Sequence, residues 1–216
     1  MQRPVTTKSP SAAPTSPLQI ADYRRFWLAR FCAVLASTGM VVIIGYQLYD
    51  VARADYGMSI AQASFQLGLL GLAQFIPIFL LTPVAGVLAD RMDRRKLAGS
   101  AAFLDCLVAI GLAVTTAMEL RNLPVLYAFG VLHGTVRVFV RPAMGAIAPN
   151  IVPAAMIPKA IALNSMAMQI GVIFGPAVAG YLFAWDRPLP YTVSAVAEVV
   201  AAIAILSIRN IPPVHA

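Results

Sequence analysis

The sequence predicts an all-α membrane protein with six transmembrane helices. Hydrophobic residues make up 60% of its 216 residues and charged residues only 12%, which is too apolar for an ordinary soluble domain. Six apolar runs are each long enough to cross the hydrocarbon core of a bilayer. Basic residues concentrate in alternate segments between those runs, which is typical of a multi-pass protein with one face in the cytoplasm.

Runs of roughly 18 to 24 apolar residues match the length that a transmembrane helix requires. We expect six spans, near residues 27–49, 65–88, 98–118, 124–142, 160–183 and 190–208. Short loops between them force neighbouring helices into antiparallel hairpins. The chain is therefore expected to comprise three parts, which are a disordered cytoplasmic tail (1–22), the transmembrane domain (23–209) and the start of a cytoplasmic loop or tail (210–216).

The amino-terminal tail is rich in Pro, Ser, Thr and Ala, a composition that predicts disorder. It does not resemble a cleavable signal peptide, because the apolar run that follows continues to about Tyr49 and is too long for one. Arg24, Arg25 and Trp27 precede the first span. Basic and aromatic side chains of this kind anchor a helix end at the membrane interface.

The distribution of Lys and Arg predicts the orientation. If the amino terminus is inside, the inner segments hold ten basic residues and the outer segments hold three. The inner ones are Arg3, Lys8, Arg24, Arg25, Arg91, Arg94, Arg95, Lys96, Lys159 and Arg209, and the outer ones are Arg53, Arg121 and Arg187. By the positive-inside rule, both termini are expected in the cytoplasm of a bacterium whose inner membrane the chain crosses.

A dense basic segment, Gly86 to Leu97, separates the second and third spans and reads GVLADRMDRRKL. It resembles the loop after helix two of the major facilitator superfamily, with the pattern G-x-L-A-D-R-x-x-R-R. In that family the loop is a conformational latch, so the resemblance implies latch roles for a set of five residues. They are Gly86, Asp90, Arg91, Arg94 and Arg95. The alternative is a charged hairpin that only obeys the positive-inside rule.

Each latch residue suggests a contact. Gly86 has no side chain, so the end of its helix can approach a neighbour closely. The Asp90 carboxylate suits a helix amino terminus or a nearby arginine such as Arg94. Asp93 replaces the second glycine of the family pattern. It could instead pair with Arg91 or Arg95.

The fifth span contains a second motif, GVIFGPAVAG, which runs from Gly171 to Gly180. Gly171 and Gly175 are four residues apart and predict one small-residue face for close helix contact. Pro176 removes a backbone donor and bends a helix. The segment resembles the G-x-x-x-G-P-x-x-G-G motif of proton-coupled exporters in the superfamily, with Ala179 in place of the first paired glycine.

Other stretches resemble the transmembrane secretion effector branch of the superfamily, which includes the enterobactin exporter. They are 23–29, 68–77, 141–153 and 160–165, and the resemblance covers roughly residues 20 to 185. It implies that the six spans form the amino-terminal half of a major facilitator fold, with three helices and three inverted helices. The sequence itself shows no internal repeat.

Ionisable residues inside spans are costly and usually face a cavity or a partner. His133, Arg137 and Arg141 recur at every fourth position and share one face of helix four. In the family this helix lines the substrate path, although the Q-G that follows the family's helix-four arginine is absent here. Asp105 lies at a similar depth to Arg137, so the two could form a structural ion pair or belong to a functional site.

Glu198 lies near the middle of the sixth span and is the candidate for a protonatable group on the proton path. The basic residues that we expect on neighbouring helices, Arg137 and Arg141, lie nearer the cytoplasm. Pairing with Glu198 therefore looks strained. The alternative is a packing residue, because helix six often lies away from the cavity in the family.

These features predict a secondary active transporter that exports a small organic molecule, such as a siderophore or a drug, by proton antiport. The alternative is a non-transporting membrane scaffold or an inactive truncated product. No enzyme, metal-ligand or cofactor motif is present in the spans. Family members have twelve spans, so the expected partner is a second six-helix half or a second copy. The chain could be a fragment or truncated product of such a transporter, could assemble from two copies, or could be completed by a separate second-half chain. We favour truncation.

Overall fold

The computed structural model describes residues 15–120, 122–145 and 147–209, and helices account for nearly all of them. Six long helices follow one another as α1 (Ala21–Ala54), α2 (Ile60–Arg91), α3 (Arg94–Ala117), α4 (Leu123–Gly145), α5 (Ile157–Trp185) and α6 (Leu189–Leu206). All six are long and apolar enough to cross a membrane, and the described part contains no strand. The predicted all-α architecture with six spans is confirmed.

The expectation of a disordered tail as far as residue 22 is wrong for the segment that precedes α1. Pro17–Gln19 forms a short 3-10 helix with Pro17 buried, and α1 already begins at Ala21. Arg24 donates a hydrogen bond to the Leu18 carbonyl at 3.2 Å, which ties this segment to the helix. Residues 1–14 and 210–216, the remaining parts of the two predicted tails, lie outside the described residues.

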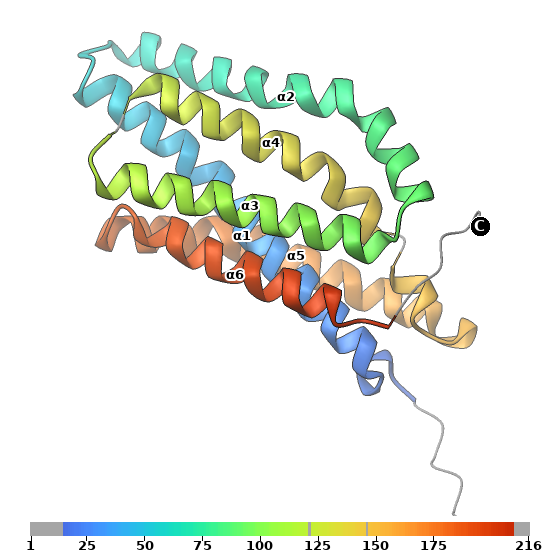
Figure 1. The fold of residues 1–216 in the computed structure, drawn as a ribbon. Coiled ribbons are helices and arrows are strands. Elements are labelled where there is room, and N and C mark those ends of the chain that lie inside the picture. Colours follow the sequence, from blue (N-terminus) through green and yellow to red (C-terminus); the bar gives the residue numbers. More distant parts are fainter. Residues whose placement is uncertain (1–14, 121, 146, 210–216) are drawn as a thin grey trace, which may run out of the picture.

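The helices pack in a pattern with a two-fold repeat (Figure 1). Helix α1 packs mainly on α5 and α6, whereas α4 packs mainly on α2 and α3. Exchanging α1–α3 with α4–α6 converts one set of contacts into the other, and the α3–α6 contact maps onto itself. Because each unit contains an odd number of antiparallel helices, the two units are inverted relative to each other. The packing therefore contains the three-plus-three repeat that the sequence does not reveal.

Local sequence explains several helix boundaries. Ser59 and Gln62 form a reciprocal capping box at the start of α2, with hydrogen bonds of 3.2 and 2.8 Å between side chains and backbone amides. The Asp93 carboxylate caps α3 by accepting a hydrogen bond from the Arg95 amide at 2.9 Å. These caps satisfy orphan amide donors at helix ends. Polar side chains thus fix where α2 and α3 begin.

A buried hydrogen-bond triad joins α1, α3 and α6. The Tyr191 hydroxyl donates to Gln47 Oε1 at 2.6 Å, and Gln47 Nε2 donates to the Thr116 hydroxyl at 3.0 Å. All three side chains are buried among apolar neighbours. Because a buried polar group without a partner is costly, the triad fixes how these three helices meet.

Helices α2 and α5 bury the smallest share of their residues and carry large apolar side chains on their exposed faces. Phe65, Phe79 and Ile173 are each about two-thirds exposed, at 66%, 68% and 67%. Soluble monomers seldom expose so much contiguous apolar surface. An apolar exterior around a helical bundle suits the hydrocarbon region of a bilayer, where backbone groups are satisfied within each helix.

Candidate functional site

A cavity of about 170 Å³ lies inside the bundle, and five of the six helices contribute to its wall. Its polar and charged lining comes from α1, α3, α4 and α6, while α5 adds Met168 and Val172. The polar and charged lining residues are Arg30, Ser37, Thr38, Asp105, Arg137 and Glu198. Ionisable groups are rare within transmembrane helices, and their convergence on one cavity marks the candidate site.

Asp105 of α3 and His133 of α4 form a buried hydrogen-bonded pair beside this cavity. The distance between His133 Nδ1 and Asp105 Oδ1 is 2.7 Å, and the side chains are 0% and 3% exposed. The other ring nitrogen of His133 lies 3.3 Å from the Ser37 carbonyl oxygen of α1. The sequence interpretation considered Arg137 as the partner of Asp105. The structure instead gives that role to His133, one helical turn earlier.

Glu198 is only 2% exposed, and it lines the same cavity as Asp105. Glu198 thus lines a cavity inside this bundle, and its roles as a protonatable group and as a packing residue both stay predictions. The neighbours of Glu198 along α6 are small, including Ala195, Ala201 and Ala202, which lets the helix pack closely. The carboxyl group consequently reaches the wall of a cavity deep in the bundle.

Arg30 is the residue that the sequence reasoning missed. It lies nine residues after the start of α1 at Ala21, lines the cavity and donates a hydrogen bond to Met168 Sδ at 3.5 Å. Arg30 thus adds to Arg137 and Arg141, the basic residues that were expected on the helices around Glu198. The sequence did offer a way to find Arg30, because it is a charged residue within the apolar run 27–49. Arg141 lies in α4, and its side chain is outside the described part of the structure.

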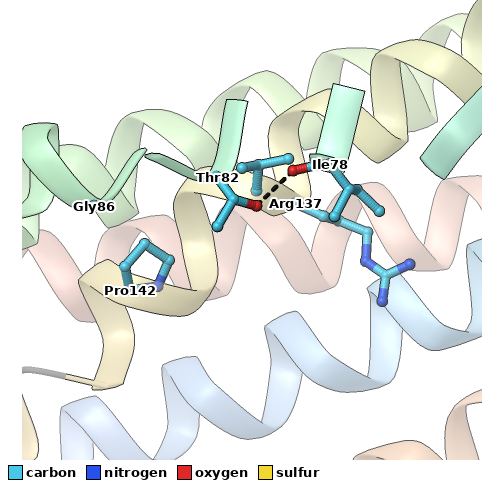
Figure 2. Close-up of a pocket in the computed structure, with 6 residues that line it drawn as sticks. Ile78, Thr82, Gly86, Arg137 and Pro142 are labelled. Carbon is cyan, nitrogen blue, oxygen red and sulfur yellow. Dashed lines mark hydrogen bonds between the residues drawn. The ribbon is translucent and has the colours of Figure 1, made fainter. Parts of the chain in front are cut away.

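A second cavity, of about 350 Å³, lies between α2 and α4 and also involves Arg137. Figure 2 shows Ile78, Thr82 and Gly86 of α2 on one side and Pro142 of α4 on the other. The Thr82 hydroxyl donates to the Ile78 carbonyl, and the Arg137 side chain leads away from these α2 residues. Arg137 thus contributes to both cavities, so a movement of this one side chain would alter both.

The glycine motif of α5 lies against α1. A Cβ atom at Gly171 would be 2.8 Å from Val34 Cγ1, and one at Gly175 would be 2.6 Å from the Leu35 carbonyl oxygen. The prediction of a close helix contact through these two glycines is confirmed. Gly180 differs, because a Cβ atom there would meet nothing within 4 Å in the described residues. Pro176 lies inside α5 between these positions.

The loop between α2 and α3 is tied to the end of α6. Asp93 forms an ion pair with Arg95 at 2.7 Å, which is one of the two pairings that the sequence suggested. Arg95 also donates to the Ile208 carbonyl. Burial by itself raises the pKa of Asp93. The hydrogen bonds and positive charge of Arg95, together with the Lys96 amide, outweigh burial and hold the pKa below its ordinary value.

The other proposed latch residues have fewer contacts within this chain. A Cβ atom at Gly86 would meet nothing within 4 Å, so no described helix makes the close approach that the sequence suggested. Asp90 and Arg91 are exposed, and Arg94 is half-buried. Among the described residues, no ion pair joins Asp90 to Arg94. The exposed carboxylate remains accessible to a group outside the described chain.

A bundle of six apolar helices around a charged interior cavity defines a multi-pass membrane protein of the transporter type. The chain belongs to the transmembrane secretion effector family of the major facilitator superfamily, whose family model matches residues 12–214. This membership confirms the resemblance drawn from the loop and glycine motifs. The fold is consistent with one half of a major facilitator transporter.

Curated relatives are efflux proteins. The chain is 27% identical to macrolide efflux protein A of Streptococcus pyogenes over 188 residues, which cover 85% of this chain and 45% of the relative. It is 30% identical to the protein of that name from Enterococcus faecalis over 145 residues, covering 65% and 44%. It is 26% identical to the enterobactin exporter EntS of Shigella boydii serotype 18 over 198 residues, covering 88% and 44%. The chain thus spans less than half the length of these relatives.

Proposed function

We propose that the chain provides the amino-terminal six helices of an exporter in a bacterial inner membrane. In this proposal a small organic molecule moves outward in exchange for protons. Membership of an efflux family supports the direction of transport, and the α5 motif, which resembles that of proton-coupled exporters, supports the coupling ion. Alternating access requires two units that rock against each other around a central site. A second six-helix half or a second copy would supply the other unit.

The observation that carries the proposal is the burial of Glu198 in the charged cavity. A carboxylate in an apolar interior is strongly disfavoured when it is ionised without a partner. It therefore tends to hold a proton while the cavity is closed and to release it when water enters. A group that loads on one side and releases on the other is what proton antiport requires. Glu198 has the burial and the cavity contact that this role needs.

The substrate in this proposal is anionic or catechol-like, such as a siderophore or a drug with an acidic group. Arg30 and Arg137 both line the cavity, and guanidinium groups recognise carboxylates and other planar anions by paired hydrogen bonds. The names of the relatives point to two cargo classes, enterobactin and macrolides. The two arginines favour the enterobactin-like class, because a macrolide offers no comparable anionic group.

The test uses inside-out vesicles from cells that express the native locus, so that any second half encoded there is included. Respiration acidifies the lumen, and a pH-sensitive dye reports the gradient. A catechol siderophore should accumulate in the lumen and release protons from it, and a protonophore should abolish accumulation. Accumulation that is insensitive to the protonophore would exclude proton antiport. Absence of transport with every compound tested would favour a scaffold instead.

A further inference from the structure

The imidazole of His133 is held between two hydrogen-bond acceptors. On one side the Asp105 carboxyl oxygen is 2.7 Å from Nδ1, and on the other the Ser37 carbonyl oxygen is 3.3 Å from Nε2. The His133 side chain is completely buried, and the Asp105 side chain is 3% exposed. Water therefore does not satisfy either ring nitrogen from outside, and the protein groups determine which nitrogens carry hydrogen.

The acceptors fix the number of protons. A backbone carbonyl only accepts, so its hydrogen bond requires a hydrogen on Nε2. A neutral ring with that tautomer would turn the Nδ1 lone pair toward an ionised carboxylate only 2.7 Å away, which is repulsive. The contact is favourable only if one further proton lies between Nδ1 and Asp105. That proton can sit on the ring or on the carboxyl, and the pair is neutral overall in both cases.

We propose that His133 and Asp105 form a second proton-binding site, separate from Glu198, and that the structure shows this site loaded. When the proton leaves to water in the opened cavity, the neutral ring keeps one hydrogen, which moves to Nδ1 and still bonds the ionised Asp105. Nε2 then has no hydrogen to donate to the Ser37 carbonyl, so the contact between α4 and α1 loosens. The inference deepens the proposed function, since it adds a site to the same proton-coupled cavity. It gives proton release a direct mechanical effect on two helices.

The surroundings of the pair include charges of both signs. Three charged residues line the cavity that Asp105 also lines. They are Glu198 of α6, Arg30 of α1 and Arg137 of α4. The thiols of Cys32 on α1 and Cys106 on α3 are also nearby groups that can titrate. The described lining from α5 is apolar, and α2 contributes none to this cavity.

The decisive experiment observes the ring nitrogens of His133 directly. The chain has two histidines, so the variant His215→Asn, labelled with 15N-histidine and reconstituted in lipid nanodiscs, gives signals from His133 alone. At neutral pH both ring nitrogens should show the protonated chemical shift or a proton shared with Asp105. In Asp105→Asn, which keeps the side-chain shape, one nitrogen should become unprotonated. A plain neutral tautomer at neutral pH with Asp105 present would overturn the inference.

The mechanical consequence has its own measurement. Spin labels at Val42 of α1 and Leu132 of α4, which are 45% and 50% exposed, report the separation of the two helices in a background without Cys32 and Cys106. The separation should increase over the pH range in which the His133 signals change, and it should not respond in Asp105→Asn. An unchanged separation would overturn the link between proton release and helix contact.

These readouts do not depend on transport. A neutral His133 in a chain that still supports gradient-driven export would remove the second proton site and leave the proposed function intact. A doubly protonated His133 in a protein whose export ignores the proton gradient would remove the proposed function, and with it the role of the pair in coupling.

Discussion

At the scale of single residues, Gly175 and Gly180 belong to one motif but differ in their surroundings. A Cβ atom at Gly175 would clash with Thr38 Oγ1 and lie 2.6 Å from the Leu35 carbonyl oxygen, whereas one at Gly180 would meet nothing within 4 Å. Rotation of Thr38 cannot relieve the clash with a backbone oxygen. We therefore expect Gly175→Ala to lower the free energy of unfolding by about 1–3 kcal/mol through overpacking between α1 and α5.

Gly180→Ala is the matched control for that prediction. It adds the same methyl group to the same helix in open space, so stability should stay within about 1 kcal/mol of wild type. Unfolding of the purified chain in detergent, followed by circular dichroism, compares the two variants. Equal stability of both variants would mean that the α1–α5 contact tolerates a larger separation than the structure indicates.

The Asp93–Arg95 pair predicts a pH-dependent contribution to stability. The pKa of Asp93 is lowered in the folded protein, so its contribution is present above the unfolded pKa of about 3.9 and is lost as the pH falls through the lower folded pKa. Asp93→Asn retains a capping side chain but removes the charge. It should destabilise the chain by roughly 1–3 kcal/mol at neutral pH, because a hydrogen bond to a charged group is lost.

The difference between wild type and Asp93→Asn should shrink as the pH falls below about 3.9, because unfolded wild type then takes up the proton first. The difference should vanish once the pH is below the lower folded pKa and Asp93 is neutral in both states. Unfolding measured over a pH series gives this comparison directly. A difference that stays constant over the whole acidic range would show that the charge of Asp93 contributes nothing.

Residue-level reasoning from the sequence found the ionisable groups but not their partners. His133, Arg137, Asp105 and Glu198 stood out because each interrupts an apolar span. The pairing of Asp105 with His133 depends on the rotation and axial offset of α3 and α4, which sequence periodicity does not determine. Arg30 was overlooked because it lies close to the basic cluster before the first span and resembles part of that anchor.

At the scale of elements, the loop between α2 and α3 has two parts that differ in their contacts with the rest of the chain. Asp93 and Arg95 join the loop to the end of α6, whereas Asp90 is exposed and lacks an ion pair among the described residues. We predict that Asp90→Asn leaves membrane insertion and folding unchanged but reduces export by the assembled transporter at least several-fold. In the latch role that the family resemblance implies, the Asp90 carboxylate would act on a group outside this bundle, so its loss would change only the conformational equilibrium.

Export assays in vesicles and a folding assay on the same Asp90→Asn preparation make this comparison. Export at the wild-type level in the variant would show that the loop is only a charged hairpin and has no latch function. Reduced export together with misfolding would give Asp90 a role in the stability of this chain instead.

The six helices were predictable because each must bury a long apolar run in the bilayer. The observed helices extend beyond the predicted spans by several residues at most ends; α1, for example, covers 21–54 and not 27–49. Polar residues at the membrane interfaces continue a helix without adding to hydropathy. A span predicted from hydropathy is therefore shorter than the helix that contains it. The triad of Gln47, Thr116 and Tyr191 was not predictable, because it requires three helices to meet at one depth.

At the scale of the whole molecule, the orientation in the membrane is a prediction that rests on charge. Ten basic residues in the inner segments against three in the outer ones place both termini in the cytoplasm. Alkaline phosphatase fusions after residues 121 and 187 should therefore be active, and a fusion after residue 209 should be inactive. Inactive fusions at 121 and 187 would show that the topology is reversed or that one of the six spans does not cross the membrane.

The inverted repeat also emerges only at this scale. Its two units share no visible sequence similarity, yet α1 and α4 make equivalent contacts with the other helices. The contact glycines match only in part. Gly39 of α1 lies against α5 as Gly134 of α4 lies against α2, whereas Gly175 of α5 has no counterpart among the glycines of α2, where a Cβ atom would meet nothing within 4 Å in the described residues. Because different residues satisfy the same packing geometry, sequence comparison within the chain could not reveal the repeat.

The measurement that most directly tests the account is the effect of Glu198→Gln on two modes of transport by the native locus. The amide preserves the shape of the side chain but cannot release a proton, so gradient-driven accumulation should be lost while exchange of labelled for unlabelled substrate continues without a gradient. Ser194→Ala, a buried change one turn earlier on α6, is the control and should retain both modes. Gradient-driven accumulation at the wild-type level in Glu198→Gln would contradict the proposal that this buried carboxyl couples export to protons.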